Sequence, residues 1–413
     1  MNFIKNLFSI SFGVTVFFRA FTWHFLGEYI PYTIIYLSFI SFWGFFAFSQ
    51  LKKFSFNSQC SHIIVLLIGF YIIWGLSNIV NLDFVDTFLV MIRSLLMLSF
   101  ISISCFWICK YNCLIGVIKS SFFALSILLI GSFFYYFNEI NLYSTIGTFW
   151  ISDESLRTRV RFGFNNNIAA EYGLSVILMS LVIFKSINKK RIISKILLLN
   201  VDFLMILIIL ASNSRGTTLA LFFLMLIYPI VVLIRKNKIL SVAKILTFFL
   251  LIVISVIVIA TLFYQLDLRE LLSGTNRTHF FSNIDCLRAS ERWLMGLGNI
   301  SGSYFSNRNV LYGVPLDYME VSYVGFFVMN GIIGCLWIGY IIYILIYSSI
   351  KCIELNNEYI DRFVLILLLY MLLISCFEGY IFSYTYITST IFLLFILSNI
   401  NIVEKKWGTK VCR

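Results

Sequence analysis

The chain has 413 residues, of which 60% are hydrophobic and only 12% charged, and it carries a formal net charge of +12 and a mean hydropathy of +0.94. Soluble domains carry charge on about a quarter of their residues, so this composition excludes an ordinary soluble enzyme. Continuous apolar runs, rather than alternating ten-residue segments, favour membrane-crossing α-helices over a β-barrel. Each crossing needs about 20 residues.

In chain order, the apolar runs predict an all-α, polytopic helix bundle of about twelve crossings that forms a single integral membrane domain, 1–413. Residues 1–26 lack a small-residue cleavage site, so we predict a first crossing that is retained rather than a signal peptide. The predicted crossings are 6–26, 30–50, 62–80, 87–108, 113–135, 167–185, 196–213, 217–234, 239–263, 320–348, 362–380 and 384–401.

The basic residues predict the orientation of these crossings. With the N-terminus inside and the crossings alternating, all sixteen lysines fall on or near the inner side, and both termini are inside. The outer loops, of which 136–166 and 264–319 are the longest, contain no lysine. They contain nine arginines: Arg157, Arg159, Arg161, Arg215, Arg269, Arg277, Arg288, Arg292 and Arg308.

An arginine-only outer surface favours a phosphate or pyrophosphate ligand. The guanidinium is a planar fork that binds phosphate oxygens in bidentate fashion and is less strongly hydrated than ammonium. The alternative is that these arginines form ordinary ion pairs with the nearby carboxylates of Asp153, Glu154, Asp285 and Glu291.

The first arginine motif is "RTRVRFGFNNNIAAEYG", residues 157–173. Its first three arginines alternate with other residues, so an extended segment would place Arg159 and Arg161 on one face. Three asparagines, 165–167, then predict a cap for the next helix.

The second motif is "ASNSRGTTLAL", residues 211–221. Ser212, Asn213 and Ser214 are good N-cap residues, and Arg215 lies at the start of the following crossing. Because a helix N-terminus carries free amides and partial positive charge, the motif predicts an anion site at the membrane surface. The alternative is a simple helix cap with a snorkelling arginine.

Within the loop 264–319, "SNIDCLRASERWLMGLG" (282–298) predicts a short amphipathic helix. Arg288 and Arg292 are four residues apart and would share one face of it. We interpret the helix either as a cationic lid over a lipid phosphate or as a surface helix held by Asp285 and Glu291.

Candidate proton acceptors follow. In "GVPLDYMEVSYVGFFVMNGIIG" (313–334), Asp317 and Glu320 are either acids that favour a helix N-terminus or general bases beside the arginines. Glu171 and Glu378 could join them. His279 is either a loop contact or a proton carrier.

Further charges are predicted inside the membrane. Arg19 and Arg93 would add to the positive field near the outer boundary, whereas Asp202 is interpreted as a contact between helices. The three histidines and the cysteines show no ligand spacing, so we expect no metal, and no nucleotide-binding motif or other cofactor signature is present.

Four segments together resemble the O-antigen polymerase and ligase family of integral membrane glycosyltransferases. "RVRFGFNNNIAAEYG" and "ASNSRGTTLAL" are similar to two of the family's arginine motifs. "LRASERWLMGLGNISG" and "DYMEVSYVGFFVMNGIIG" resemble the stretch before its final long loop and the start of the following helix. The likeness covers residues 157–334.

This resemblance implies a GT-C-like bundle in the inner membrane of a bacterium, with cytoplasmic termini, periplasmic loops at 136–166 and 264–319, and short helices in the longer loop. It implies a metal-independent polymerase that transfers a growing glycan from undecaprenyl pyrophosphate to the non-reducing end of a new lipid-linked repeat unit. Expected partners are these lipid-linked units, membrane lipids and a chain-length regulator, without nucleic acid.

By the same resemblance and by position, Arg215, Arg161 and Arg288, with Arg159 and Arg292, would bind pyrophosphate. Glu320, Asp317 and His279 are the candidates for the base. The ligase relatives typically carry His-Asn where this chain has Leu316-Asp317-Tyr318, which favours a polymerase. An O-antigen ligase and a flippase for the same lipid-linked glycan are the alternatives.

Overall fold

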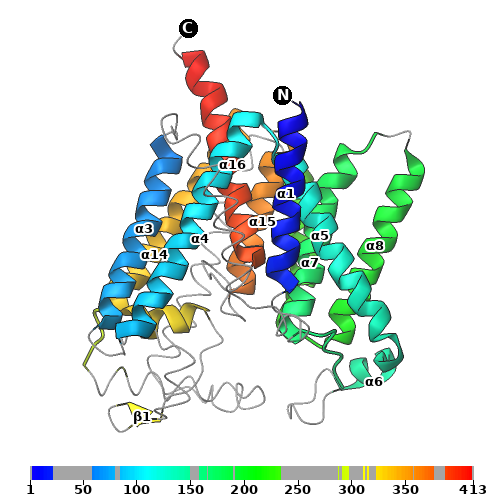
Figure 1. Ribbon diagram of the computed structural model, residues 1–413, viewed down its shortest axis with the longest axis horizontal. Coiled ribbons are helices and arrows are strands. Elements are labelled where there is room, and N and C mark those ends of the chain that lie inside the picture. Colours follow the sequence, from blue (N-terminus) through cyan, green and yellow to red (C-terminus); the bar gives the residue numbers. More distant parts are fainter. Residues whose placement is uncertain are drawn as a thin grey trace.

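The computed structural model is an α-helical bundle in the part of the chain that it describes (Figure 1). It describes residues 2–21, 58–79, 84–148, 158–164, 166–188, 191–233, 287, 291–296, 310–311, 314–315, 322–356, 358–375 and 387–411. The only strands in these ranges, β1 (Val310–Leu311) and β2 (Val314–Pro315), pair antiparallel.

Ten of the predicted crossings correspond to helices in the described part, whereas 30–50 and 239–263 lie outside it. The long helices are α1 (Asn2–Phe21), α3 (Ser58–Ile79), α4 (Phe84–Tyr111), α5 (Leu114–Tyr135), α7 (Asn166–Ser186), α8 (Ile192–Ala211), α9 (Arg215–Leu233), α14 (Ser322–Leu355), α15 (Tyr359–Ile374) and α16 (Ile387–Val411). Within loop 136–166 there are two short helices, η3 (Phe137–Glu139) and α6 (Leu142–Gly147).

Seven of the described helices are long and apolar enough to cross a membrane: α1, α4, α5, α7, α8, α14 and α16. The prediction of an α-helical membrane bundle is confirmed at this level.

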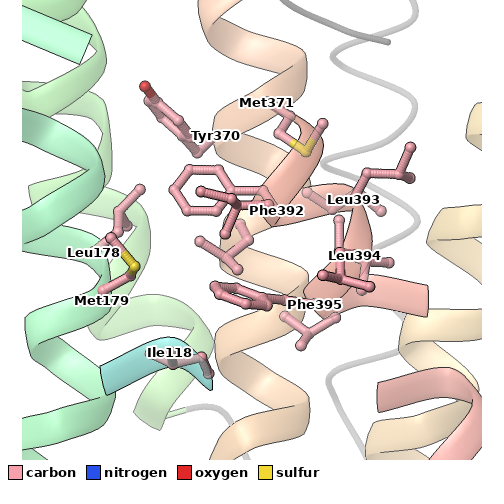
Figure 2. Close-up of a cluster of buried hydrophobic side chains, with 14 of the residues drawn as sticks. Ile118, Leu178, Met179, Tyr370, Met371, Phe392, Leu393, Leu394 and Phe395 are labelled. Carbon is pink, nitrogen blue, oxygen red and sulfur yellow. The ribbon is translucent and has the colours of Figure 1, made fainter. Parts of the chain in front are cut away.

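The buried hydrophobic core includes side chains from all ten long helices, among them α7, α15 and α16. The apolar window of α16 is 89% buried, whereas that of α8 is only 22% buried, so α16 is central and α8 lies at the edge. Figure 2 shows part of this core, where Tyr370 of α15 packs edge-on against Phe392 of α16, with their ring centroids 5.7 Å apart. Leu178 and Met179 of α7 lie on the other side of this cluster.

The first residues of α1 and the last turns of α16 lie at the same end of the bundle (Figure 1). We call this the inner end and the opposite one the outer end, following the predicted orientation. Between them, Ser180 of α7 donates a hydrogen bond of 2.8 Å to Asp202 Oδ2 of α8. The interpretation of Asp202 as a contact between helices is therefore confirmed.

The inner end is closed by a hydrogen-bond network around Asp361, which is fully buried. Its carboxylate accepts hydrogen bonds from the Asn399 amide (2.9 Å), the Asn356 amide (3.1 Å) and the Glu358 backbone N–H (2.8 Å). Lys406 Nζ donates to Asn356 Oδ1 and pairs with Glu358 Oε1 at 2.9 Å. The network joins the last turn of α14, the start of α15 and α16.

Candidate anion site at the outer end

The two arginine motifs meet at the outer end. The Val160 N–H donates to the carbonyl oxygen of Ala211 at 3.0 Å. The Asn213 side chain donates to the carbonyl oxygens of Thr158 and Thr145, at 3.3 and 3.4 Å. Residues 158–164 and 211–218, which were predicted as separate sites, thus form one unit that we call the arginine junction.

Two left-handed turns shape the arginine junction. Phe162 and Gly163 have φ angles of 49° and 76°, and the Phe164 N–H donates to the Arg161 carbonyl at 2.8 Å. Asn213 has a φ of 53°, a conformation that asparagine tolerates better than most residues. These turns reverse the chain directly before α7 and directly after α8.

The start of α9 is a buried group of hydroxyls. Ser214 precedes the first helical residue, as predicted for a cap, and its hydroxyl donates to Thr217 Oγ1 at 3.0 Å. The Thr218 hydroxyl donates to the Ser214 carbonyl at 2.8 Å. Ser212 and Asn213 terminate α8 rather than cap α9, because the N–H of each donates to a carbonyl of α8.

The arginines of the first motif differ in exposure. Val160 is buried, Arg161 is exposed and Arg159 is half-buried, so the two arginines do not share one exposure. Arg161 forms no ion pair within the described part of the chain, so no described carboxylate fulfils the ion-pair alternative for it. Arg215 begins α9, and its side chain lies outside the described structure.

An aromatic and charged layer lies beneath the arginine junction. Phe164 packs edge-on against Tyr172 at 5.7 Å, and Phe162 stacks on Phe133 at 6.4 Å. Arg19, at the end of α1, is 7% exposed and interacts electrostatically with the phenol of Tyr172. The prediction that Arg19 strengthens the positive field near the outer boundary is consistent with this place.

Sequence reasoning named Glu171 but missed Tyr172. Both side chains are fully buried at the start of α7. The hydroxyl of Tyr172 and the Oδ1 atom of Asn213 have no hydrogen-bond partner among the described residues. The ring of Tyr136 packs edge-on against that of Phe162 in the arginine junction. Burial raises the pKa of the Tyr136 phenol.

The predicted lid helix does not continue through Arg292. Glu291 has a left-handed φ of 54°, and residues 291–296 form turns rather than a helix. The physical reason is that the carbonyls of Trp293 and Leu294 accept hydrogen bonds from α14, at 2.9 and 3.2 Å. A continuous helix therefore does not include Arg292.

The remaining predicted site residues lie outside the described part of the chain: Glu320, Asp317, His279, Arg288 and Glu378, together with the side chain of Arg93. Within the described part of the chain, the Arg292 side chain forms no hydrogen bond or ion pair with the arginine junction. Among the described residues, no group of three histidine, cysteine or acidic side chains is arranged to hold a metal.

No protein-family model matches this chain, and no curated protein matches it.

Proposed function

We propose that the protein is an O-antigen polymerase of a bacterial inner membrane. It would transfer the growing glycan from undecaprenyl pyrophosphate to the non-reducing end of a new lipid-linked repeat unit. The observation that carries the proposal is the arginine junction, because two segments that resemble separate family motifs are hydrogen-bonded to each other at one end of a membrane bundle.

The chemistry requires cations rather than a strong base alone. A hydroxyl of the acceptor sugar attacks the anomeric carbon of the donor, the bond from that carbon to the pyrophosphate oxygen breaks, and the hydroxyl proton passes to a base. Arg161, with Arg159 and Arg215, would stabilise the charge that develops on the pyrophosphate. Glu320, Asp317 or His279 would accept the proton.

The directions of the described helices support twelve crossings. Cys60 near the start of α3 lies 4.0 Å from Cys105 near the end of α4, at the inner end, whereas α1 finishes at the outer end beside Tyr172. Likewise α9 finishes at the inner end beside Tyr359, whereas α14 begins at the outer end. The predicted runs 30–50 and 239–263 would supply the two returns.

The position of buried charge favours a polymerase over a flippase. Arg19, Glu171 and Asp361 are the buried charged residues of the described part, and each lies within about a turn and a half of a helix end. Transporters place such charges around a cavity at the bilayer midplane. Asp202, midway along α8, is half-buried and bonded to Ser180.

The proposal is tested by deleting the gene and separating the lipopolysaccharide on a gel. A polymerase predicts a ladder that collapses to core plus one repeat unit. Bare core with polymer on the lipid carrier would instead indicate a ligase, and bare core with single units on the inner leaflet a flippase. An unchanged ladder would exclude all three.

Complementation then tests the arginine junction. Arg161→Ala should fail to restore the ladder, and Arg161→Lys should restore it partly, because lysine keeps the charge but loses the bidentate fork. The matched control is Arg191→Ala, which removes an exposed arginine at the inner end of α8. A full ladder with Arg161→Ala would remove the central residue of the proposed site.

A further inference from the structure

Helix α14 is interrupted near the outer end. Gly331 has a φ of 62° and a ψ of −164°, so α14 consists of two helical pieces, 322–330 and 332–355. This combination of angles is essentially restricted to glycine, because any Cβ would clash with the backbone. The sequence predicted a single crossing over residues 320–348 here.

The interruption redirects two backbone hydrogen bonds. In an unbroken helix the N–H groups of Ile332 and Ile333 would donate to carbonyls four residues earlier. Instead they donate to the carbonyls of Trp293 (2.9 Å) and Leu294 (3.2 Å) in the segment 291–296. This segment therefore caps the second piece of α14, and the amides that an anion would need are already bonded to protein.

The contact is too close for any side chain at position 331. An added Cβ would lie 2.5 Å from the carbonyl carbon and oxygen of Leu294 and 2.6 Å from the nitrogen of Gly296. These are backbone atoms, so they cannot move aside as a flexible side chain would. Next to this contact, the rings of Trp293 and Phe327 pack with their centroids 6.0 Å apart.

We infer that Gly331 is a positioning residue, which docks the segment 291–296 on α14 and so places Arg292 at the outer end for the transfer reaction. The docking itself follows from the hydrogen bonds and the close approach. Only the part assigned to Arg292 rests on the proposed function. Gly331→Ala would favour a continuous helix, and the segment would then lose both amide donors.

Docking is tested on the purified full-length chain by limited trypsin digestion, with mass spectrometry of the fragments. Gly331→Ala should speed cleavage after Arg292 roughly tenfold to a hundredfold, since cleavage follows the population of the undocked segment. Cleavage after the exposed Arg161 serves as the internal reference and should not change. The matched control is Gly339→Ala, because a Cβ at this glycine of α14 meets open space.

A second variant guards against misfolding of the first. Trp293→Ala leaves the glycine intact, removes the contact with Phe327 and should speed cleavage after Arg292 by a smaller factor. The inference is overturned if cleavage after Arg292 stays within about twofold of wild type in both variants. It is also overturned if Gly331→Ala speeds cleavage after Arg161 as much as cleavage after Arg292. Gly331 would then stabilise the whole bundle rather than the docked segment.

The positioning role is tested by polymer yield in the deletion strain. Gly331→Ala should lower the yield and Gly339→Ala should not, and the double variant Gly331→Ala/Arg292→Ala should be no worse than Arg292→Ala alone. A merely structural role would make the two losses add. An unchanged ladder in the deletion strain removes the proposed function but leaves the docking result intact. If deletion of the gene abolishes the ladder and complementation with Gly331→Ala restores it fully, the positioning role is excluded and the proposed function stands.

Discussion

The buried polar groups at the two ends of the bundle have different surroundings. At the inner end, three donors surround the carboxylate of Asp361, and Lys406 bonds to two members of the same network. At the outer end, Tyr172 and Asn213 are buried, and each keeps a polar atom without a hydrogen-bond partner in the described part of the chain.

Under the proposed function the two groups have different roles, structural at the inner end and ligand-binding at the outer end. A buried polar group without a partner lowers stability, so it persists where another group completes its hydrogen bonds in the working state. The inner network is complete by itself and holds α14, α15 and α16 together. The outer end keeps hydrogen-bonding atoms without a described partner beside the exposed Arg161, where the proposed site would bind its polar ligand.

The largest expected effect is at the inner end. Asp361→Ala should lower the free energy of unfolding by about 3 kcal/mol, because it leaves several buried donors without an acceptor. Thermal unfolding of the purified protein in detergent measures this loss. Glu354→Ala, an exposed acid at the same end, should change it by less than about 0.5 kcal/mol. Equal losses from the two variants would contradict a special role for the network.

A smaller effect is expected at the outer end. Asn213→Ala removes two hydrogen bonds and places alanine at a positive φ, so it should cost about 1–2 kcal/mol of stability. Asn213→Gly removes the same bonds but relieves the backbone, and should cost less. If alanine and glycine behave alike in thermal unfolding, backbone strain contributes nothing here.

The pH dependence of stability distinguishes the inner network further. Burial raises the pKa of the Asp361 carboxyl above its ordinary value of 3.8, although its three donors oppose the shift. The folded protein therefore binds this proton more tightly than the unfolded chain. The contribution of the protonated Asp361 to the free energy of unfolding is complete below about pH 3.8, and it is lost as the pH rises through the raised pKa.

Asp361→Asn tests this sign, because asparagine does not titrate and the Asn399 amide can turn to accept a bond from it. Unfolding temperatures of the two proteins are compared across the acidic range. The wild type should lose stability relative to Asp361→Asn as the pH rises. A wild type that gains relative stability over this range would show that the hydrogen bonds outweigh burial.

The smallest expected effect on stability is that of Arg161→Ala, although it should abolish polymer. An exposed arginine without an ion pair in the described part of the chain contributes less than about 0.5 kcal/mol. The same thermal assay checks this value. A loss of more than about 1 kcal/mol would mean that Arg161 is part of the fold, and the two ends would then differ less than described.

The helices themselves could be predicted, because a crossing is a local property of about 20 apolar residues. The position directly before α9 was also predicted from local sequence, and Ser214 occupies it, with its hydroxyl donating to Thr217 Oγ1. The contact between residues 158–164 and 211–218 could not be predicted, since it joins positions about fifty residues apart and depends on how α7 packs against α8.

The errors lie where a distant segment changes local geometry. The spacing of Arg288 and Arg292 favours a helix, but Glu291 turns the chain so that two carbonyls reach α14. The break at Gly331 has the same origin. A single glycine is tolerated inside many helices, and here the helix is interrupted because another segment accepts the hydrogen bonds of the following amides. Sequence alone does not show which segment does so.

The common end of α1 and α16 has a practical consequence for locating the protein in the cell. Reporter domains fused to the two ends of this chain must fluoresce or react in the same compartment. A reporter inserted beside Tyr143 of the exposed helix α6 must respond from the opposite one. Three fusions therefore establish which face of the bundle meets the cytoplasm, without any knowledge of the substrate.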